Sequence, residues 1–358
     1  MYQILSCGSN GQYQLGQGND EDQFTLRTCE FLQDKEISTT IYSKPLKISC
    51  GGNHTLILLE DGDVYSCGNN EYKQICQEDK VQSIFKKIEF EKKIRNISCC
   101  WDSSFLVTEY NEVYSCGQGL KGELGLGLQT TSEPELKLVK KFDHNVIDIK
   151  CGMNHVIVKL DNAQLYGWGN CRKGQLGETS KKLIKRGSIW EPVLLQMQPV
   201  AVEDFLEVGR EFTIITSNGQ PYVYGKFSDD GLQNQMKDMK DIGQIKTMWA
   251  SIHFKEVSSN SIKSFGVDSH GQLFKYNIPE SDSKGFKFEV GSEHGLLQQN
   301  NKLYAWGWGE HGNCGPSLTG NPNTFNYLNQ LFPNKEFFDG KIVYFTGGCA
   351  TSWVCIEL

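Results

Sequence analysis

The sequence predicts an all-β fold, a single seven-bladed β-propeller closed by pairing of the N- and C-terminal strands. One pattern recurs along the chain: a short apolar strand, Cys-Gly or a variant, two loop residues, His, a second apolar strand, a tight turn, and aromatic-x-x-Gly. The units end at seven glycines, separated by 41 residues (Gly225 to Gly266) to 60 residues (Gly8 to Gly68). Repeats of this size are typical of propellers, whose blades bury their apolar faces only by stacking. The closing glycines are Gly8, Gly68, Gly117, Gly169, Gly225, Gly266 and Gly307.

The units follow one another in chain order. Clear copies occupy 48–70, 151–170 and 290–309, and more degenerate copies occupy 97–117, 206–225 and 247–266. Within the first clear copy, two alternating strands flank Asp61-Gly62, for which we expect a two-residue hairpin turn. Asn218-Gly219 and Asn300-Asn301 hold the same place in later units. The segment 226–244 lacks the pattern, and its Met236, Met239 and Ile242 suit one short helix or a loose loop between blades.

The seventh unit is split between the two ends of the chain. The segment 1–8 reads MYQILSCG, and 341–358, KIVYFTGGCATSWVCIEL, supplies the strands that it lacks. Pairing of the two segments would seal the ring and remove the open sheet edges that invite aggregation. We therefore expect one propeller domain over residues 1–358.

Composition narrows the class of partner. The formal charge is −7 and the pI is near 5.6. A protein that neutralises a nucleic-acid backbone usually presents a net basic surface, so direct nucleic-acid binding is not expected. Lys181, Lys182, Lys185 and Arg186 form a basic loop that could touch RNA, but solvated charge in a surface insertion is the commoner meaning of such a run.

The N-terminal residues 1–11 have no basic region and no long apolar core, and no stretch of about 18 apolar residues occurs. We therefore expect no membrane partner, and a location in the cytoplasm and also in the nucleus. The 13 cysteines include no Cys-x-x-Cys pair. They are interpreted as reduced thiols with no metal to bind.

No catalytic constellation is present, so the sequence predicts no enzyme, no cofactor and no metal. There is no nucleophile and base pair, no phosphate-binding GxxxxGK[ST] and no HExxH. His54, His155, His253 and His294 are assigned to one repeat position, which is Ser103, Phe212 or Ala350 in the other units. We expect these imidazoles to bond backbone groups inside their own blades.

This repeat resembles that of the regulator-of-chromosome-condensation family, whose unit runs CGxxHTLxLxxDGxVYxWGxNxxGQLGxG. The loop part of the unit is matched by 8–18, 117–127, 169–177 and 269–274. The resemblance implies a seven-bladed propeller. It leaves function open, because propellers host many activities.

Five stretches that the repeat does not dictate resemble a narrower group, the short fungal propellers of the alpha-tubulin suppressor type. They are 8–22, 99–104, 248–253, 291–295 with 307–316, and 347–353. That resemblance implies a heterodimer with a small CSL-type zinc protein, which serves diphthamide synthesis on elongation factor and the Elongator complex in wobble-uridine modification of tRNA. The broader family leaves an alternative, a guanine-nucleotide exchange factor for a Ran-like small GTPase.

Loop aromatics beside single charges have the composition of a protein-binding hot spot. We therefore predict partner-binding residues in the loops that follow the Cys-Gly and Trp-Gly elements. Trp306, at the regular Trp-Gly position, is instead predicted to pack in the core. The predicted partner-binding residues are Trp101, Asp102, Trp249, Glu293, Trp308, Glu310, His311 and Trp353.

Overall fold

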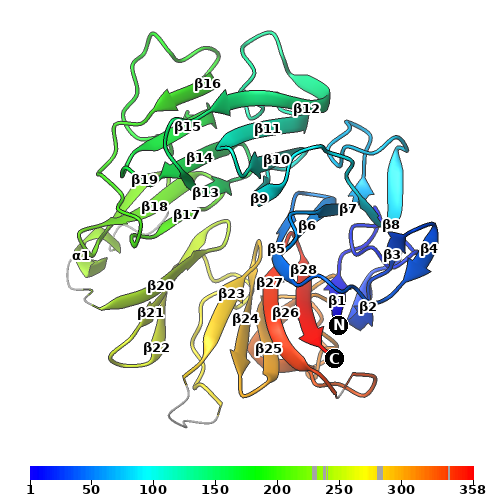
Figure 1. Ribbon diagram of the computed structural model, residues 1–358. Coiled ribbons are helices and arrows are strands. Elements are labelled where there is room, and N and C mark those ends of the chain that lie inside the picture. Colours follow the sequence, from blue (N-terminus) through cyan, green and yellow to red (C-terminus); the bar gives the residue numbers. More distant parts are fainter. Residues whose placement is uncertain (228–231, 237–238, 240, 280–284, 338) are drawn as a thin grey trace.

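Seven β-sheets stand around a central axis in the computed structural model (Figure 1). The structure describes residues 1–227, 232–236, 239, 241–279, 285–337 and 339–358. The innermost strands contact one another in a closed circle, in the order β5, β9, β13, β17, β20, β23, β27 and back to β5. The predicted seven-bladed propeller is confirmed.

The blades are numbered here in chain order. Blade 1 contains β5 (Pro45–Cys50), β6 (His54–Leu59), β7 (Val64–Asn69) and β8 (Val81–Lys87). Blade 2 contains β9 (Ile94–Cys99), β10 (Ser103–Thr108), β11 (Glu112–Gln118) and β12 (Ser132–Lys141). Blade 3 contains β13 (Val146–Cys151), β14 (His155–Leu160), β15 (Leu165–Asn170) and β16 (Ser188–Leu194). Blades 4 and 5 contain β17 (Leu206–Val208), β18 (Phe212–Ser217) and β19 (Gln220–Gly225); and β20 (Ile242–Thr247), β21 (Ser251–Glu256) and β22 (Ser261–Gly266). Blade 6 contains β23 (Lys287–Val290), β24 (His294–Gln299), β25 (Lys302–Trp308) and β26 (Thr324–Phe332).

Blade 7 is built from both ends of the chain. Its strands are β27 (Lys341–Gly347), β28 (Thr351–Glu357), β1 (Tyr2–Gly8) and β2 (Gln23–Thr28), in the sheet order β2-β1-β28-β27. β1 and β28 pair antiparallel along their full lengths, from Tyr2 opposite Glu357 to Gly8 opposite Thr351. The two termini consequently lie side by side (Figure 1). The predicted closure through the terminal strands is confirmed.

In each blade the second strand lies between the sheets of the two neighbouring blades. β6, β10, β14 and β18 are buried at every position, because neighbouring blades cover both of their faces. A strand covered on both faces shows no alternation of apolar and polar positions, and buried hydroxyls in these strands, such as those of Ser104 and Thr213, are hydrogen-bonded. Trp306 fills the space between blades 5 and 6 with no exposed surface, and its Nε1 donates to the Gln272 carbonyl at 3.0 Å. Its predicted place in the core is confirmed.

The hairpin predictions are right in two units and wrong in one. Asn218-Gly219 and Asn300-Asn301 form two-residue turns with φ between 47° and 74°, because Ser217 pairs with Gln220 and Gln299 with Lys302. Asp61-Gly62 belongs to a three-residue loop instead. There the Gly62 amide donates to the Leu59 carbonyl at 3.0 Å and Gly62 takes φ +89°. This geometry is a type I turn followed by a left-handed residue, which glycine adopts without strain.

Two short segments lie outside the regular blades. β3 (Phe31–Gln33) and β4 (Glu36–Ser38) form a hairpin between blades 7 and 1, and β3 pairs in parallel with β8. In 226–244, where the sequence left a short helix or a loose loop open, the structure has the short helix α1 (Leu232–Met236), and its Met236 packs with Met239 against the apolar side chains between blades 4 and 5. In the described part of the chain, no helix has the length and apolar character needed to cross a membrane.

One expectation about the cysteines is wrong. Cys76, in the loop after β7, and Cys116, on β11, form a disulfide that joins blades 1 and 2. The other 11 cysteines are free thiols, as expected, and most are buried. The two partners are 40 residues apart in the chain and meet only because their blades are neighbours, so no local spacing predicts the pair.

Ring closure predicts a strong dependence on the last strand. Deleting Thr346 to Leu358 removes β28, so β1 and β27 lose their shared partner and leave open edges. We expect the truncated chain to be recovered in the insoluble fraction. Expression followed by size-exclusion chromatography measures this. A soluble monomer with an unchanged thermal transition would contradict the role of β28 in closing the ring.

Candidate functional site

A channel of about 640 Å³ runs along the axis, lined by the innermost strands of the blades. Charged side chains of alternating sign occupy one equivalent position in four consecutive blades. Lys150, Glu207, Lys246 and Glu289 each pair with the third residue of the following strand, respectively Ile157, Ile214, His253 and Leu296. The equivalence means that these four side chains stand in one layer of the channel.

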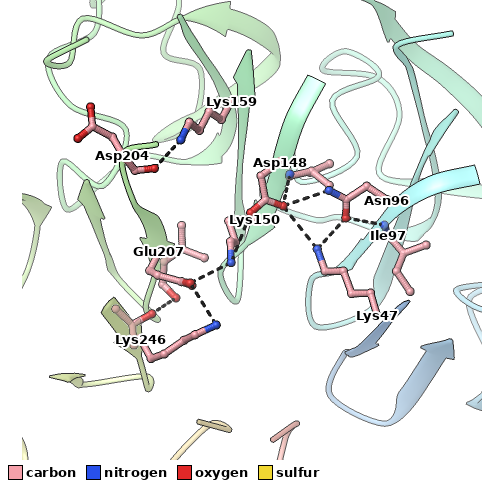
Figure 2. A network of polar contacts seen from close by, with 12 residues as sticks. Lys47, Asn96, Ile97, Asp148, Lys150, Lys159, Asp204, Glu207 and Lys246 are labelled. Atoms are coloured by element: carbon pink, nitrogen blue, oxygen red, sulfur yellow. Dashed lines mark hydrogen bonds and ion pairs between the residues drawn. The ribbon is translucent and has the colours of Figure 1, made fainter. Parts of the chain in front are cut away.

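The charges form a continuous chain of contacts, part of which Figure 2 shows. Glu207 lies 3.0 Å from Lys150 Nζ and 3.7 Å from Lys246 Nζ, and Lys246 lies 2.8 Å from Glu289. On the other side, Lys150 lies 3.5 Å from Asp148. The chain therefore joins blades 3, 4, 5 and 6 through their innermost strands.

Hydrogen bonds extend this chain to the remaining blades. Lys47 Nζ donates to Asn96 Oδ1 at 2.7 Å, and Asn96 Nδ2 donates to Asp148 Oδ1 at 3.1 Å (Figure 2). The Ile48 amide donates to the Tyr344 hydroxyl at 3.1 Å, which brings in blade 7. These contacts link blades 7, 1, 2, 3, 4, 5 and 6 in order around the axis. We call this chain the channel network.

The pKa shifts of the network follow from burial opposed by opposite charge. Burial alone would raise the pKa of Asp148, but Lys150 and Lys47 hold it below its usual range. Burial alone would lower the pKa of Lys150, but Glu207 and Asp148 raise it well above its usual range. These two groups therefore stay charged at neutral pH, and their charges are used in holding one another.

The lysines of the network are engaged by carboxylates. Among the described residues, no set of three or more His, Cys, Asp or Glu side chains is arranged to hold a metal ion. The sequence analysis missed these residues. The sequence did contain a signal for them. In the triplets IKC (149–151), LEV (206–208), IKT (245–247) and FEV (288–290), a charged residue follows an apolar one at the same strand position, and its sign alternates from blade to blade.

Three repeat histidines join neighbouring blades, which corrects the expectation that they bond backbone groups inside their own blades. The Nε2 atoms of His54, His155 and His294 lie 2.9 to 3.2 Å from hydroxyls of the next blade. Each hydroxyl donates to a backbone carbonyl in the loop after the third strand of the preceding blade, so Nε2 carries the proton. The accepting carbonyls are those of Gln74, Gln175 and Asn313. The hydroxyls are those of Ser104, Thr213 and Ser352.

His253 does not occupy the repeat position, which is a second correction. Ser251 pairs with Gly266 as His54 pairs with Gly68, so Ser251 is the equivalent residue and His253 lies two positions later. His253 bonds Ser251 and Ser264 at 3.0 and 2.8 Å within its own blade. In blade 7 the equivalent residue is likewise Thr351, not Ala350. The strand register reveals these offsets; in blade 5 the segment 247–251 also lacks the glycines that precede His54.

One face of the propeller carries most of the predicted partner-binding residues. In each blade the loop after the first strand and the loop after the third strand emerge on the same side, because the strands alternate in direction. We call this side the loop face. Asp102, Trp249 and Glu293 stand in first-strand loops, and Glu310 and His311 stand in a third-strand loop.

Trp101 and Trp249 close the channel at the loop face. They occupy the position of Gly52 in blades 2 and 5, on opposite sides of the ring, and their rings meet with centroids 5.9 Å apart. Gly52 packs flat on Trp101, where an added Cβ would lie 2.7 Å from the indole. Arg210, at the same position in blade 4, stands 5.9 Å from the Trp249 ring. Both tryptophans remain partly exposed, so the same surface is open to a partner.

The remaining predicted residues divide into an outer group and a buried one. Trp308 packs beside His270 and His311, each with centroids 6.0 Å away, and His311 Nδ1 lies 2.7 Å from Asp22. Glu310 is exposed in the same loop. Burial raises the pKa of Glu293 and of Asp102, and Glu71 raises that of Asp102 further.

Trp353 is wrongly placed by the sequence analysis. It lies on β28 with no exposed surface, its ring contacts Phe85 at 6.1 Å between centroids, and its Nε1 donates to Thr351 Oγ1 at 2.9 Å. A side chain so enclosed cannot reach a partner. The error arises because Trp353 follows the Gly-Cys-Ala loop by only a few residues, and the strand begins at Thr351.

The channel network predicts a stability loss on neutralising its shared carboxylate. Glu207→Gln keeps the side-chain volume but removes the anion that holds Lys150 and Lys246. We expect the free energy of unfolding to fall by about 2 kcal/mol. Chemical denaturation of the two proteins measures it, with the exposed Glu336→Gln as the control. Equal stabilities of Glu207→Gln and the unmodified protein would show that the network does not hold the blades.

The repeat histidines predict acid sensitivity. Burial lowers the pKa of His54 to about 3 and that of His155 to about 4, from 6.5. The unfolded chain therefore binds more protons below pH 6.5, so the stabilisation is complete above that pH and is lost as the pH falls toward 4. His54→Gln with His155→Gln should flatten this dependence, as followed by urea unfolding from pH 7 to 4. The exposed His144→Gln is the control, and an equal slope in all three proteins would refute the assignment.

Comparison with known proteins agrees with this architecture. Two sequence profiles of the regulator of chromosome condensation (RCC1) repeat match the chain, one at 3–58 and 110–158 and the other at 46–74. The RCC1 repeat-containing protein C10F6.04 of Schizosaccharomyces pombe is 29% identical over 377 residues, 99% of either chain. The secretion-regulating guanine nucleotide exchange factor of Mus musculus is 22% identical, over 93% of this chain and 80% of its own length.

Solved structures show the same fold. Yeast RCC1 (Prp20), in its complex with Kap60, superposes with a TM-score of 0.80 at 19% identity, covering 100% of this chain and 89% of that one. Prp20p from Saccharomyces cerevisiae gives a TM-score of 0.78, also at 19% identity, covering 100% and 92%. Seven blades, a closure through the chain ends and the matched repeats lead to one conclusion: the chain is a seven-bladed β-propeller that contains RCC1 repeats within 3–74 and 110–158 and shares the fold of yeast RCC1.

Proposed function

We propose that this propeller is a non-catalytic scaffold that binds a protein partner on its loop face, and that the partner is a small CSL-type zinc protein. The observation that carries the proposal is spatial. The five stretches that resemble the alpha-tubulin suppressor group are scattered from residue 8 to residue 353, yet each contains a loop of the loop face. They belong to blades 2, 5, 6 and 7 only. A shared binding surface explains why these distant segments all resemble the alpha-tubulin suppressor group at positions that the repeat does not fix.

The loop around Trp308 has the make-up of an anchor for that partner. Trp308 is held between two imidazoles, and the hydrogen bond between His311 Nδ1 and Asp22 Oδ2 ties the loop of blade 6 to that of blade 7. A preordered aromatic loses little side-chain entropy on binding. Glu310 projects beside it into solvent, where it can meet a basic group of the partner.

The cellular role that we propose follows from the partner. As half of a heterodimer with the zinc protein, the propeller would support diphthamide synthesis on elongation factor and the Elongator-dependent modification of wobble uridine in tRNA, in the cytoplasm and nucleus. The propeller would contribute a binding surface and no catalytic group, since the charges of the channel network hold the blades together. Contact with the Elongator complex would pass through the same heterodimer.

Nucleotide exchange on a Ran-like small GTPase is the second candidate. The mouse relative is named as an exchange factor, and exchange needs an inserted element that displaces Mg²⁺ and phosphate. The β3–β4 hairpin is the insertion that would have to serve this role, with Asp34 and Lys35 at its tip. Ile37 and Tyr42 beside it are 62% and 81% exposed. A pull-down from the native host separates the candidates, since a small metal-containing protein supports the first and a small GTPase the second.

Anchoring through Trp308 predicts separable effects on binding and on stability. Trp308→Ala and Glu310→Lys should weaken binding of the zinc protein about 30-fold, because an anchor residue typically contributes about 2 kcal/mol or more. Their melting temperatures should stay close to that of the unmodified chain. Isothermal titration of the purified pair measures the first effect and thermal melts the second.

Trp306→Ala is the matched control, two residues away. It should lower the melting temperature by opening a cavity between blades, while the affinity of the folded fraction is retained. Unchanged affinity in both Trp308→Ala and Glu310→Lys would remove this loop from the interface and direct attention to Trp101 and Trp249.

A further inference from the structure

A basic groove crosses the loop face on the side away from Trp308. It consists of two adjoining hollows of about 490 and 340 Å³ that share Glu211 and end at Trp249, beside the channel mouth. Loops of blades 2, 3, 4 and 5 form its walls. Six cationic side chains line it, against the single carboxylate of Glu211: Lys121, Arg172, Lys173, Arg186, Arg210 and Lys226.

Among the described residues these cations form no ion pair at contact distance, although Glu123 and Glu293 act on Lys121 and Arg210 at longer range. In the described residues, none of the six has a carboxylate oxygen within 4.0 Å, whereas Lys47, Lys150 and Lys246 in the channel each have one or two. All six are exposed. Local structure holds one of them in place: Arg172 donates to the Arg186 backbone carbonyl at 3.0 Å and lies across Gly187, where an added Cβ would stand 2.2 Å from its Nε. A preorganised arginine is suited to bidentate binding of a carboxylate.

The groove also has an apolar end. Trp190 forms part of its floor and is 6% exposed, with its Nε1 donating to the Lys185 carbonyl at 2.8 Å. Leu120, on the rim, is 65% exposed although it lies next to this indole. A side chain placed between Leu120 and Trp190 would bury apolar surface that water now covers.

The opposite edge of the same face is acidic. Asp20, Glu21 and Asp22 are exposed in the loop of blade 7, and Glu310 is exposed in that of blade 6. Blade 7 faces blades 3 and 4 across the axis in a ring of seven. The loop face therefore has one basic edge and one acidic edge, which together form a charge dipole. The acidic edge would repel a nucleic acid that lay across the face, because a nucleic acid is anionic along its whole length.

We propose that the basic groove is a second docking site, which binds an extended acidic polypeptide segment carrying one apolar residue. The carboxylates of the segment pair with Arg172, Arg186 and Arg210, and its apolar side chain packs against Leu120 and Trp190. The basic groove is separate from the Trp308 loop. Binding in the groove therefore does not depend on which protein binds at the Trp308 loop. A partner with a complementary dipole would engage both edges of the face in one orientation.

Fluorescence anisotropy with the full chain tests the site. The probe is a labelled short glutamate peptide with one central leucine, at about 0.15 M ionic strength. Arg172→Glu with Arg186→Glu should weaken its binding by at least about tenfold. Glu211→Gln removes the carboxylate of the groove and should strengthen binding, so the proposal stays testable if the double variant folds poorly.

Controls separate this site from general attraction and from the Trp308 loop. Lys335→Glu makes the same kind of charge change at an exposed position outside the groove and should leave the affinity unchanged, as should Trp308→Ala. The same peptide with glutamine in place of glutamate should not bind. Equal weakening by Lys335→Glu, tighter binding of a single-stranded oligouridylate of matched charge, or no binding of the glutamate peptide would each overturn the proposal.

Discussion

A blade of this protein is a small twisted sheet with apolar side chains on both faces, and nothing in the blade itself can cover them. Each blade is stable only between two neighbours, so the ring must close for the first and last blades to have one. The pairing of β1 with β28 meets this requirement, because it makes blade 7 out of both chain ends. Every other feature of the molecule, including the channel and the order of the loops on each face, depends on that closure.

Closure places seven innermost strands around a narrow polar channel, and this explains the side chains found there. A layer of like charges in such a space would repel, and a layer of unpaired charges would be costly to remove from water. Alternation of lysine and glutamate in blades 3 to 6 avoids both costs and adds bonds between blades. The histidine to hydroxyl bonds do the same nearer the loop face, where they tie the start of a strand to the next blade.

The loops of the loop face are released from these constraints, and the differences between blades are concentrated there. Gly52 and its counterparts Trp101, Arg210 and Trp249 occupy one position of the repeat, yet this position holds a glycine, an arginine or a tryptophan in different blades. Their backbones make similar contacts, since Gly52 N donates to the Trp101 carbonyl and Arg210 N to the Trp249 carbonyl. A scaffold of this kind holds side chains of different chemistry at regular spacing, which suits recognition of a partner with an uneven surface.

Much of the fold could be predicted from the sequence, because the repeat, its closing glycines and the split unit are local patterns with a fixed period. The same reasoning identified Trp306 as core and most of the loop aromatics as lying in loops. It failed for Trp353, His253 and Asp61-Gly62, where a shift of one or two residues in strand register decides whether a side chain is buried, repeat-equivalent or in a turn. Register depends on pairing between strands, which the repeat pattern alone does not resolve in degenerate copies.

By itself, then, the sequence determined the all-β class, the number of blades and the closure through the chain ends, since these follow from periodicity and from the need to bury apolar strands. Only the tertiary structure decided which residues meet across blades. The channel network, the Cys76–Cys116 disulfide and the basic groove each join residues 40 or more positions apart or loops of different blades. Their geometry arises from the curvature of the closed ring, a property of the whole assembly that no single repeat carries.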